Sequence, residues 1–161
     1  MKRAVTQYRG LVELCTAAVI VVCIACLGAC GGPETGPEDQ LRLWVSRAEE
    51  AAEAKQRRKL IDMISPAYAD SRGWERRDVD NLLRAYFFRQ NSITLLTKIE
   101  EIRVYGDSAA EIEMTVGMAG QNDGVLGFSA DAYQFEMELM KEGDDWLLIS
   151  ARWGELGEEL R

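Results

Sequence analysis

The feature that most constrains the fold is an alternation of hydrophobic and polar residues in the second half of this 161-residue chain. Between residues 110 and 118 every second side chain is hydrophobic, and the intervening ones include two glutamates and a threonine. Residues 133–139 repeat the pattern, with Tyr, Phe, Met and Leu set against Gln and Glu. Because successive side chains of a strand point to opposite faces, both segments predict strands with one buried face.

Two further strands complete the predicted sheet. Residues 93–105 also alternate, but the phase changes between Ile99 and Ile102, which predicts a β-bulge. Residues 146–153 predict the last strand, after a turn at residues 142–145. The glycine-rich segment 117–127 predicts a hairpin loop, and it lacks the Gly-Lys-Ser/Thr ending of a phosphate-binding loop.

Helices are predicted before the strands. From Glu38 to Ser65 hydrophobic residues recur about every 3.6 positions, which predicts one long helix that Pro66 stops. A second helix is predicted from Glu75 to Gln90. Helices followed by four antiparallel strands indicate an α+β fold, with N-terminal helices packed on a curved four-stranded antiparallel sheet. A curled sheet wrapped on helices forms a cone with a pocket at its wide end.

Three segments carry a resemblance to a known fold. They are Ser65-Pro-Ala-Tyr68, the long strand from Ile93, and the closing hairpin YQFEMELMKEGDDWLLISARW at residues 133–153. From about Asp39 to Trp153 the chain resembles the nuclear transport factor 2-like (NTF2-like) superfamily, also called the cystatin-like cone or SnoaL-like fold. That resemblance implies the cone architecture. The superfamily includes ketosteroid isomerases, cyclases and dehydratases, and also non-catalytic binding and assembly modules.

All four cysteines fall in the first thirty residues, so the remaining chain has no disulfide framework. Lys2, Arg3 and Arg9 precede an uncharged hydrophobic run over residues 14–29, which is shorter than the roughly 20 residues of a membrane-spanning helix. This arrangement predicts a cleaved export signal over residues 1–29. The Cys23-Ile-Ala-Cys26 redox pattern inside it lacks the folded context that such a motif needs.

The signal ends in Leu27-Gly28-Ala29-Cys30, which resembles the lipobox of bacterial lipoproteins. The resemblance implies cleavage before Cys30, acylation of that cysteine, and outer-membrane sorting toward the periplasm where the envelope has two membranes. Several acyl chains anchor a protein durably. The alternatives are an ordinary signal peptide cut after Ala29 and an uncleaved membrane anchor. Residues 30–37 then form a Gly/Pro tether, and residues 38–161 form the α+β cone domain.

Charge narrows the range of partners. The formal net charge is −8, and residues 1–29 hold three basic residues and one glutamate, so the remainder carries −10. An acidic domain is unsuited to nucleic acid. The absence of histidine excludes histidine-based catalysis and metal sites, and the strand glutamates fall on a solvent face. No metal and no cofactor are therefore expected.

Seven residues are candidates for lining a ligand pocket, and no catalytic residue is assigned. They are Tyr68, Asp70, Trp74, Tyr86, Trp146, Arg152 and Trp153. Asp70 beside Tyr68 suits an acid/base pair, but aspartate also favours turns. Arg152 suits either an anionic ligand or a cross-strand pair with Glu136 or Glu138.

Two functions are consistent with these features. The first is an envelope lipoprotein, held to the membrane through Cys30, whose domain is a non-catalytic module for a protein partner or a small hydrophobic ligand. Such a module could also form a homodimer through its sheet. The alternative is a small isomerase or dehydratase with a carboxylate in the cone. The first is preferred because the catalytic inventory is small.

Overall fold

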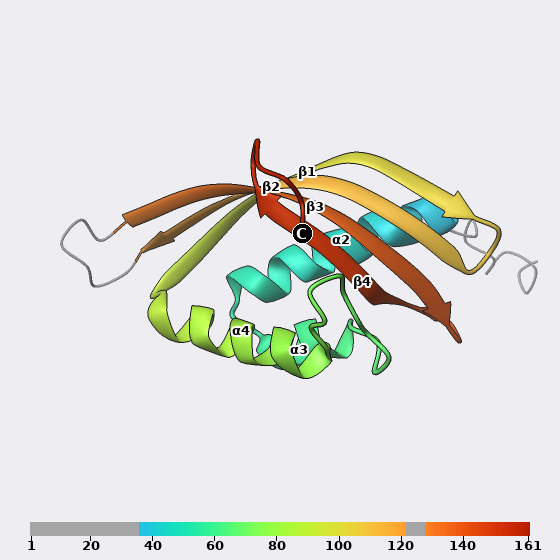
Figure 1. The fold of residues 1–161 in the computed structure, drawn as a ribbon, viewed down its shortest axis with the longest axis horizontal. Coiled ribbons are helices and arrows are strands. Elements are labelled where there is room, and N and C mark those ends of the chain that lie inside the picture. Colours follow the sequence, from blue (N-terminus) through green and yellow to red (C-terminus); the bar gives the residue numbers. More distant parts are fainter. Residues whose placement is uncertain (1–35, 122–127) are drawn as a thin grey trace, which may run out of the picture. The chain divides into compact units, whose positions relative to one another are not determined.

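Three helices precede four strands in the computed structural model, which describes residues 36–121 and 128–161 (Figure 1). The helices are α2 (Pro37–Glu53), α3 (Arg57–Asp62) and α4 (Arg76–Arg89). None of these described helices is long and hydrophobic enough to cross a membrane. The predicted export signal and Cys30 lie outside the described residues. Residues 36–161 form one compact unit.

The prediction of one long helix was wrong. Helix α2 ends at Glu53, Lys55 adopts a left-handed conformation with φ 54°, and α3 begins two residues later. A lysine with positive φ is uncommon because its Cβ crowds the backbone. Here the Nζ of Lys55 donates a hydrogen bond of 2.7 Å to the carbonyl of Gln90, at the end of α4. The break therefore ties the end of α2 to the end of α4.

The four strands form one antiparallel sheet in the order β1-β2-β3-β4. Their bounds are β1 Ser92–Tyr105, β2 Ala109–Gln121, β3 Phe128–Glu142 and β4 Asp145–Glu155. The predicted loop at residues 117–127 was too long, because β2 continues to Gln121 and β3 begins at Phe128. Glycines can continue a strand there because the ladder hydrogen bonds need only the backbone.

Two irregularities bend the sheet. The predicted bulge in β1 is confirmed, since the register with β2 shifts between Ile99 and Glu101. Its extra residue brings Ile102 and Val104 onto the same face as Ile99, where all three pack against the core. A second shift, between Glu138 and Leu139 in the pairing of β3 with β4, was not predicted.

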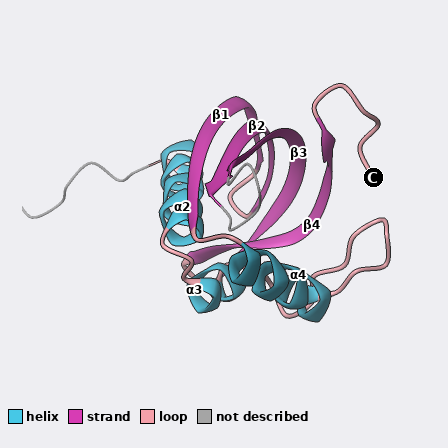
Figure 2. Ribbon diagram, turned by 90° about the vertical axis from the view of Figure 1, so that its left-hand side faces the viewer, coloured by secondary structure: helices cyan, strands magenta, loops and turns pink. Residues whose placement is uncertain are grey.

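All three helices lie on the concave side of the sheet, whose strands arch over them (Figures 1 and 2). This arrangement confirms the predicted α+β cone. The core lies between α2, the segment after α3 and the concave face, and every member of it falls within residues 41–151. Its buried members are Leu41, Trp44, Val45, Ile64, Tyr68, Ala110, Ile112, Met137, Leu139, Trp146 and Ala151. The buried core therefore lies within one compact unit, residues 36–161.

Candidate functional site

Tyr68 and Asp70 lie together in the segment that joins α3 to α4. The Oδ1 of Asp70 accepts hydrogen bonds from the backbone N–H groups of Arg72 (2.9 Å) and Trp74 (2.8 Å), which closes a tight turn. Gly73 occupies the left-handed position that this turn requires, with φ 76°. Asp70 therefore has the turn-forming role that aspartate favours.

The other carboxylate oxygen of Asp70, Oδ2, is buried and has no hydrogen-bond partner of normal geometry among the described residues. Burial and the negative charge of Asp70 raise the pKa of Tyr68 to about 12, and the nearby Arg72 acts in the opposite direction. Only 3% of the Tyr68 surface is exposed. Both side chains are therefore largely buried, although Tyr68 lines the edge of a groove beside α4.

An aromatic row runs across the concave face from β3 to the turn before α4. Its members are Tyr133, Phe135, Trp153 and Trp74. The ring centroids of Tyr133 and Phe135 are 6.5 Å apart, as are those of Phe135 and Trp153, which are stacked with an interplanar angle of 19°. Trp153 then meets Trp74 edge-on at 5.6 Å. Phe135 and Trp153 are directly opposite each other on neighbouring strands, so the sheet register builds this row.

Arg72 covers one end of the aromatic row. Its guanidinium carbon lies 3.9 Å from the ring centroid of Trp153 and 5.9 Å from that of Trp74. Its Nη2 also donates a hydrogen bond of 2.6 Å to the Trp153 carbonyl. A cation held over an indole face at this distance is attracted by the ring quadrupole.

At the other end of the row, Tyr133 lies near Tyr86 of α4 and Asp131 of β3. Burial raises the pKa of Tyr86, and the charge of Asp131 and the neighbouring Tyr133 raise it further. Burial, Asp131 and Glu155 have the same effect on the pKa of Tyr133. Both hydroxyls are therefore protonated at neutral pH and can donate hydrogen bonds.

Asp131 and Tyr133 were not among the residues predicted to line a pocket, although the sequence contains a signal for both. Asp131 precedes Tyr133 by two residues, so the alternation that predicted this strand also assigns both to one face. The signal was missed because the predicted strand was begun at Tyr133. We refer to Tyr86, Asp131, Tyr133, Phe135 and Trp153 as the concave-face site.

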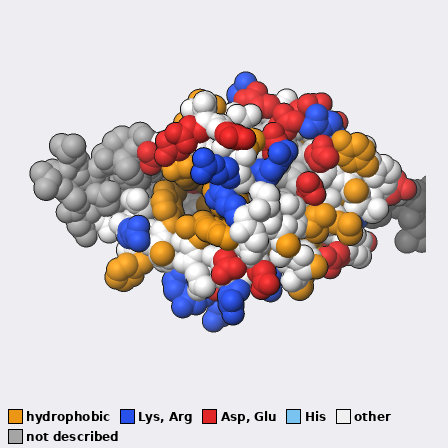
Figure 3. Space-filling model, viewed as in Figure 1, with side chains coloured by type: hydrophobic (Ala, Val, Ile, Leu, Met, Phe, Trp, Pro, Cys, Tyr) orange, Lys and Arg blue, Asp and Glu red, His pale blue; other side chains and the backbone are white. Residues whose placement is uncertain are grey.

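Helix α4 leaves this site partly uncovered. None of its residues is buried, whereas α2 buries four. The hydrophobic side chains of α4 that are half-buried are Val79, Leu83, Tyr86 and Phe87. Figure 3 shows a hollow on this side of the molecule, with hydrophobic side chains in it and Lys or Arg side chains beside it.

The remaining predicted pocket residues lie elsewhere. Trp146 is buried in the core, where its Nε1 donates a hydrogen bond of 3.1 Å to Gln40 of α2. Arg152 lies on the outer face of the sheet and forms an ion pair with Glu136 on β3. The structure thus brings Trp74, Tyr86 and Trp153 to the open part of the concave side and separates Trp146 and Arg152 from them.

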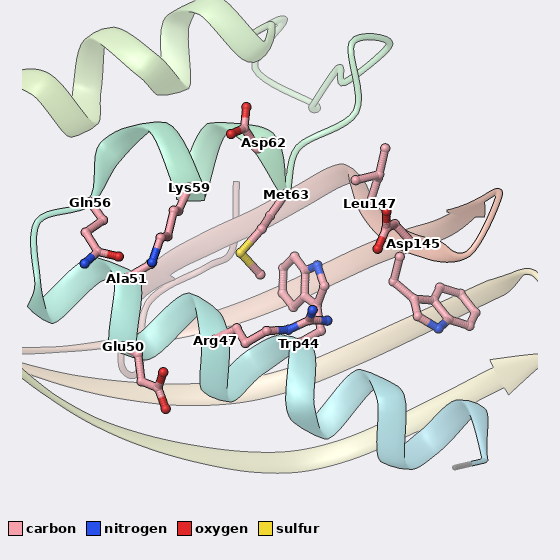
Figure 4. Close-up of a pocket in the computed structure, with 11 residues that line it drawn as sticks. Trp44, Arg47, Glu50, Ala51, Gln56, Lys59, Asp62, Met63, Asp145 and Leu147 are labelled. Carbon is pink, nitrogen blue, oxygen red and sulfur yellow. The ribbon is translucent and has the colours of Figure 1, made fainter. Parts of the chain in front are cut away.

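A separate groove of about 500 Å³ lies between α2, α3 and the start of β4 (Figure 4). Its charged lining is mixed, with Arg47 and Lys59 opposed by Glu50, Asp62 and Asp145. The Nε1 of Trp44, which also lines the groove, is buried and has no hydrogen-bond partner among the described residues. A second groove, of about 650 Å³, runs between residues 66–69 and the start of α4. Neither groove contains the aromatic row.

Within residues 36–121 and 128–161, no group of three or more Cys, Asp or Glu side chains is arranged to hold a metal ion. On the outer face of the sheet, Arg103 instead forms ion pairs with Glu101, Glu111 and Glu113. This face is a charged, solvent-facing surface.

No protein-family model matches the sequence, and the search of curated proteins found no match. Solved structures do match. A candidate scytalone dehydratase from Novosphingobium aromaticivorans has a TM-score of 0.66 at 9% identity, over 72% of this chain and 81% of that chain. A candidate dehydratase of the NTF2-like family from Streptomyces avermitilis has a TM-score of 0.64 at 16% identity, over 76% and 98% of the two chains.

A third match has a different description. It is a candidate calcium/calmodulin dependent protein kinase II association domain from Xanthomonas campestris, with a TM-score of 0.64 at 13% identity over 80% and 94% of the chains. At these identities the similarity establishes the fold alone, which is the NTF2-like cone. Enzyme names and an association domain both occur on this fold, so function depends on the site.

Proposed function

We propose that this protein is a lipid-anchored binding protein of the bacterial envelope, whose cone domain takes up a small hydrophobic or aromatic ligand at the concave-face site without catalysing a reaction. The observation that carries this proposal is the half-exposed aromatic row beside a helix that buries none of its residues. Binding sites for small molecules are concave and largely hydrophobic, with a few polar groups that fix orientation.

The proposed non-catalytic role rests on what Asp70 does. Its Oδ1 is occupied by two backbone N–H groups, and its Oδ2 is shielded from solvent. A general base must come within hydrogen-bond reach of the proton that it removes. Asp70 instead stabilises the turn before α4 by accepting hydrogen bonds from its backbone.

The binding proposal is tested with a neutral dye, N-phenyl-1-naphthylamine, and a chain that begins at residue 31. We expect saturable fluorescence enhancement that weakens about tenfold in Tyr133→Ala, because each buried aromatic contact contributes about 1.5 kcal/mol. The control Leu43→Ala removes an exposed hydrophobic side chain from α2 and should leave binding unchanged. Unsaturable binding, or equal binding by both variants, would contradict the proposal.

The membrane anchor is tested separately on the full-length protein. The lipobox-like residues 27–30 support acylation of Cys30. Mass spectrometry of the membrane fraction should find an acylated Cys30 at the mature N-terminus, and Cys30→Ala should release the protein from the membrane or block its processing. An unmodified N-terminus that begins elsewhere would contradict the anchor and leave the binding proposal standing.

A second candidate function rests on Asp131. This exposed carboxylate lies near two protonated tyrosine hydroxyls, an arrangement that suits proton removal by Asp131 and hydrogen bonding to a developing oxyanion by a tyrosine. It favours an isomerase or dehydratase. If a substrate is found, Asp131→Asn should abolish turnover and retain substrate binding, whereas a binding protein would show no turnover to lose.

A further inference from the structure

We infer that the concave-face site selects a cationic ligand, of the quaternary ammonium or amine class, which it holds over the ring of Tyr133 with Asp131 as the counter-ion. This inference rests on the proposed binding function and narrows its ligand. Three observations on the described residues support it. Two carboxylates lie on the same face as Tyr133, neither of them forms an ion pair with a described residue, and the guanidinium of Arg72 already lies over another ring of the aromatic row.

The sheet register brings two carboxylates to the tyrosine end of the row. Tyr133 is directly opposite Glu155 on β4, so these two side chains share a face. Asp131 lies two residues before Tyr133 on β3 without an intervening bulge, so it shares that face as well. Both carboxylates are exposed. A ligand that reaches Tyr133 therefore lies on the same face as two carboxylates.

Neither carboxylate forms an ion pair with a described residue, and the outer face of the same sheet differs in this respect. There, Glu111 and Glu113 pair with Arg103, and Glu136 pairs with Arg152. The sequence thus supplies arginines to most outer-face glutamates and none within 4.0 Å of Asp131 or Glu155 among the described residues. A cation from outside the chain would complement them.

One ring of the aromatic row already contacts a cationic side chain. Arg72 places its guanidinium carbon 3.9 Å from the Trp153 centroid. Tyr133, two rings further along the row, has no cation over its face among the described residues. Ammonium ligands are recognised by aromatic faces combined with a nearby carboxylate, because the ring quadrupole and the charge act together.

The test compares choline with 3,3-dimethylbutan-1-ol, its uncharged isostere of the same shape, by calorimetric titration of the chain that begins at residue 31. We expect choline to bind at least about fivefold more tightly than the isostere. Asp131→Asn should reduce this preference to less than about twofold, since it removes the counter-ion and keeps the side-chain shape.

The matched control is Glu138→Gln, which neutralises a carboxylate on the outer face of the same strand and should keep the wild-type preference. Equal binding of choline and the isostere by the wild type, or the same loss in both variants, would overturn the inference. If the neutral dye still binds in a Tyr133-dependent way while choline shows no preference, the cationic ligand is wrong and the binding function stands. Loss of dye binding as well would mean that the proposed function itself has failed.

Discussion

The guanidinium of Arg72 lies over the indole of Trp153, 3.9 Å from its centroid, and donates a hydrogen bond to the carbonyl of the same residue. These two residues are far apart in the chain, and their contact joins the turn before α4 to the last strand. The C-terminal segment reinforces this position, because the backbones of Trp153 and Arg161 exchange hydrogen bonds. Trp153 is therefore held on both its side chain and its backbone.

The first prediction concerns this contact. Arg72→Ala should lower the free energy of unfolding by about 1–2 kcal/mol, since it removes a cation–π contact and a charge-assisted hydrogen bond. Arg72→Lys should recover part of the loss, because lysine keeps the charge and lacks the planar fork. Urea denaturation measures both. Arg42→Ala, which breaks the exposed pair with Glu38, should cost less than about 0.5 kcal/mol.

The second prediction follows from the raised pKa of Tyr68, about 12 against an ordinary value of 10.0. Below pH 10 the tyrosine is protonated in both folded and unfolded chains, so its contribution to stability is complete. Between pH 10 and 12 the unfolded chain loses its proton first, and the protein should lose up to about 2–3 kcal/mol. Urea midpoints at pH 9 and pH 11.5 should show this loss in the wild type and a smaller one in Tyr68→Phe. If the wild type and Tyr68→Phe lose the same stability, the loss comes from groups other than Tyr68.

The third prediction concerns the register of β3. Leu139 is 1% exposed and its neighbour Met140 is 45% exposed, because successive side chains point to opposite faces. Leu139→Ala should cost about 2–5 kcal/mol by leaving a core cavity, and Met140→Ala should cost less than about 0.5 kcal/mol. Thermal or urea unfolding compares the two variants. A larger cost at Met140 would show that the strand is shifted by one residue.

The fourth prediction separates the structural role of Asp70 from a catalytic one. Asp70→Ala removes the acceptor of two backbone N–H groups and should destabilise the protein by about 1–2 kcal/mol. Asp70→Asn keeps an acceptor oxygen and should cost less. Neither variant should change the affinity for the neutral dye beyond its effect on folding. An Asp70→Asn variant that folds normally and loses binding would show that Asp70 contacts the ligand.

Much of the fold could be predicted because the alternation in residues 110–118 and 133–139 is a local property of strands. The bulge in β1 was also predictable, since a change of phase between Ile99 and Ile102 has to be absorbed by an extra residue. The shift between Glu138 and Leu139 was not, because residues 146–153 are mostly hydrophobic and show no clear change of phase.

The candidate site was only half predictable. Trp74, Tyr86 and Trp153 were selected as aromatic residues near a possible pocket, and the structure brings them to the open part of the concave side. Asp131 was missed because the predicted strand was begun two residues later, at Tyr133. Asp131 on β3 acts on Tyr86, which lies on α4. The order of residues along the chain does not show that these two residues are neighbours.

The sequence by itself determined the class of the fold, because hydrophobic periodicity records which face of each strand and helix is buried. It also determined that the domain has no disulfides, since no cysteine follows Cys30. The tertiary structure alone decided where α2 ends, because the left-handed Lys55 is held by the carbonyl of Gln90, thirty-five residues away. It likewise decided which carboxylates have partners: register gives most outer-face glutamates an arginine and leaves Asp131 beside two tyrosines. The local hydrophobic pattern determines which face of a strand or helix each residue occupies. Which residues become its neighbours is determined only by the pairing of segments that are distant in the sequence.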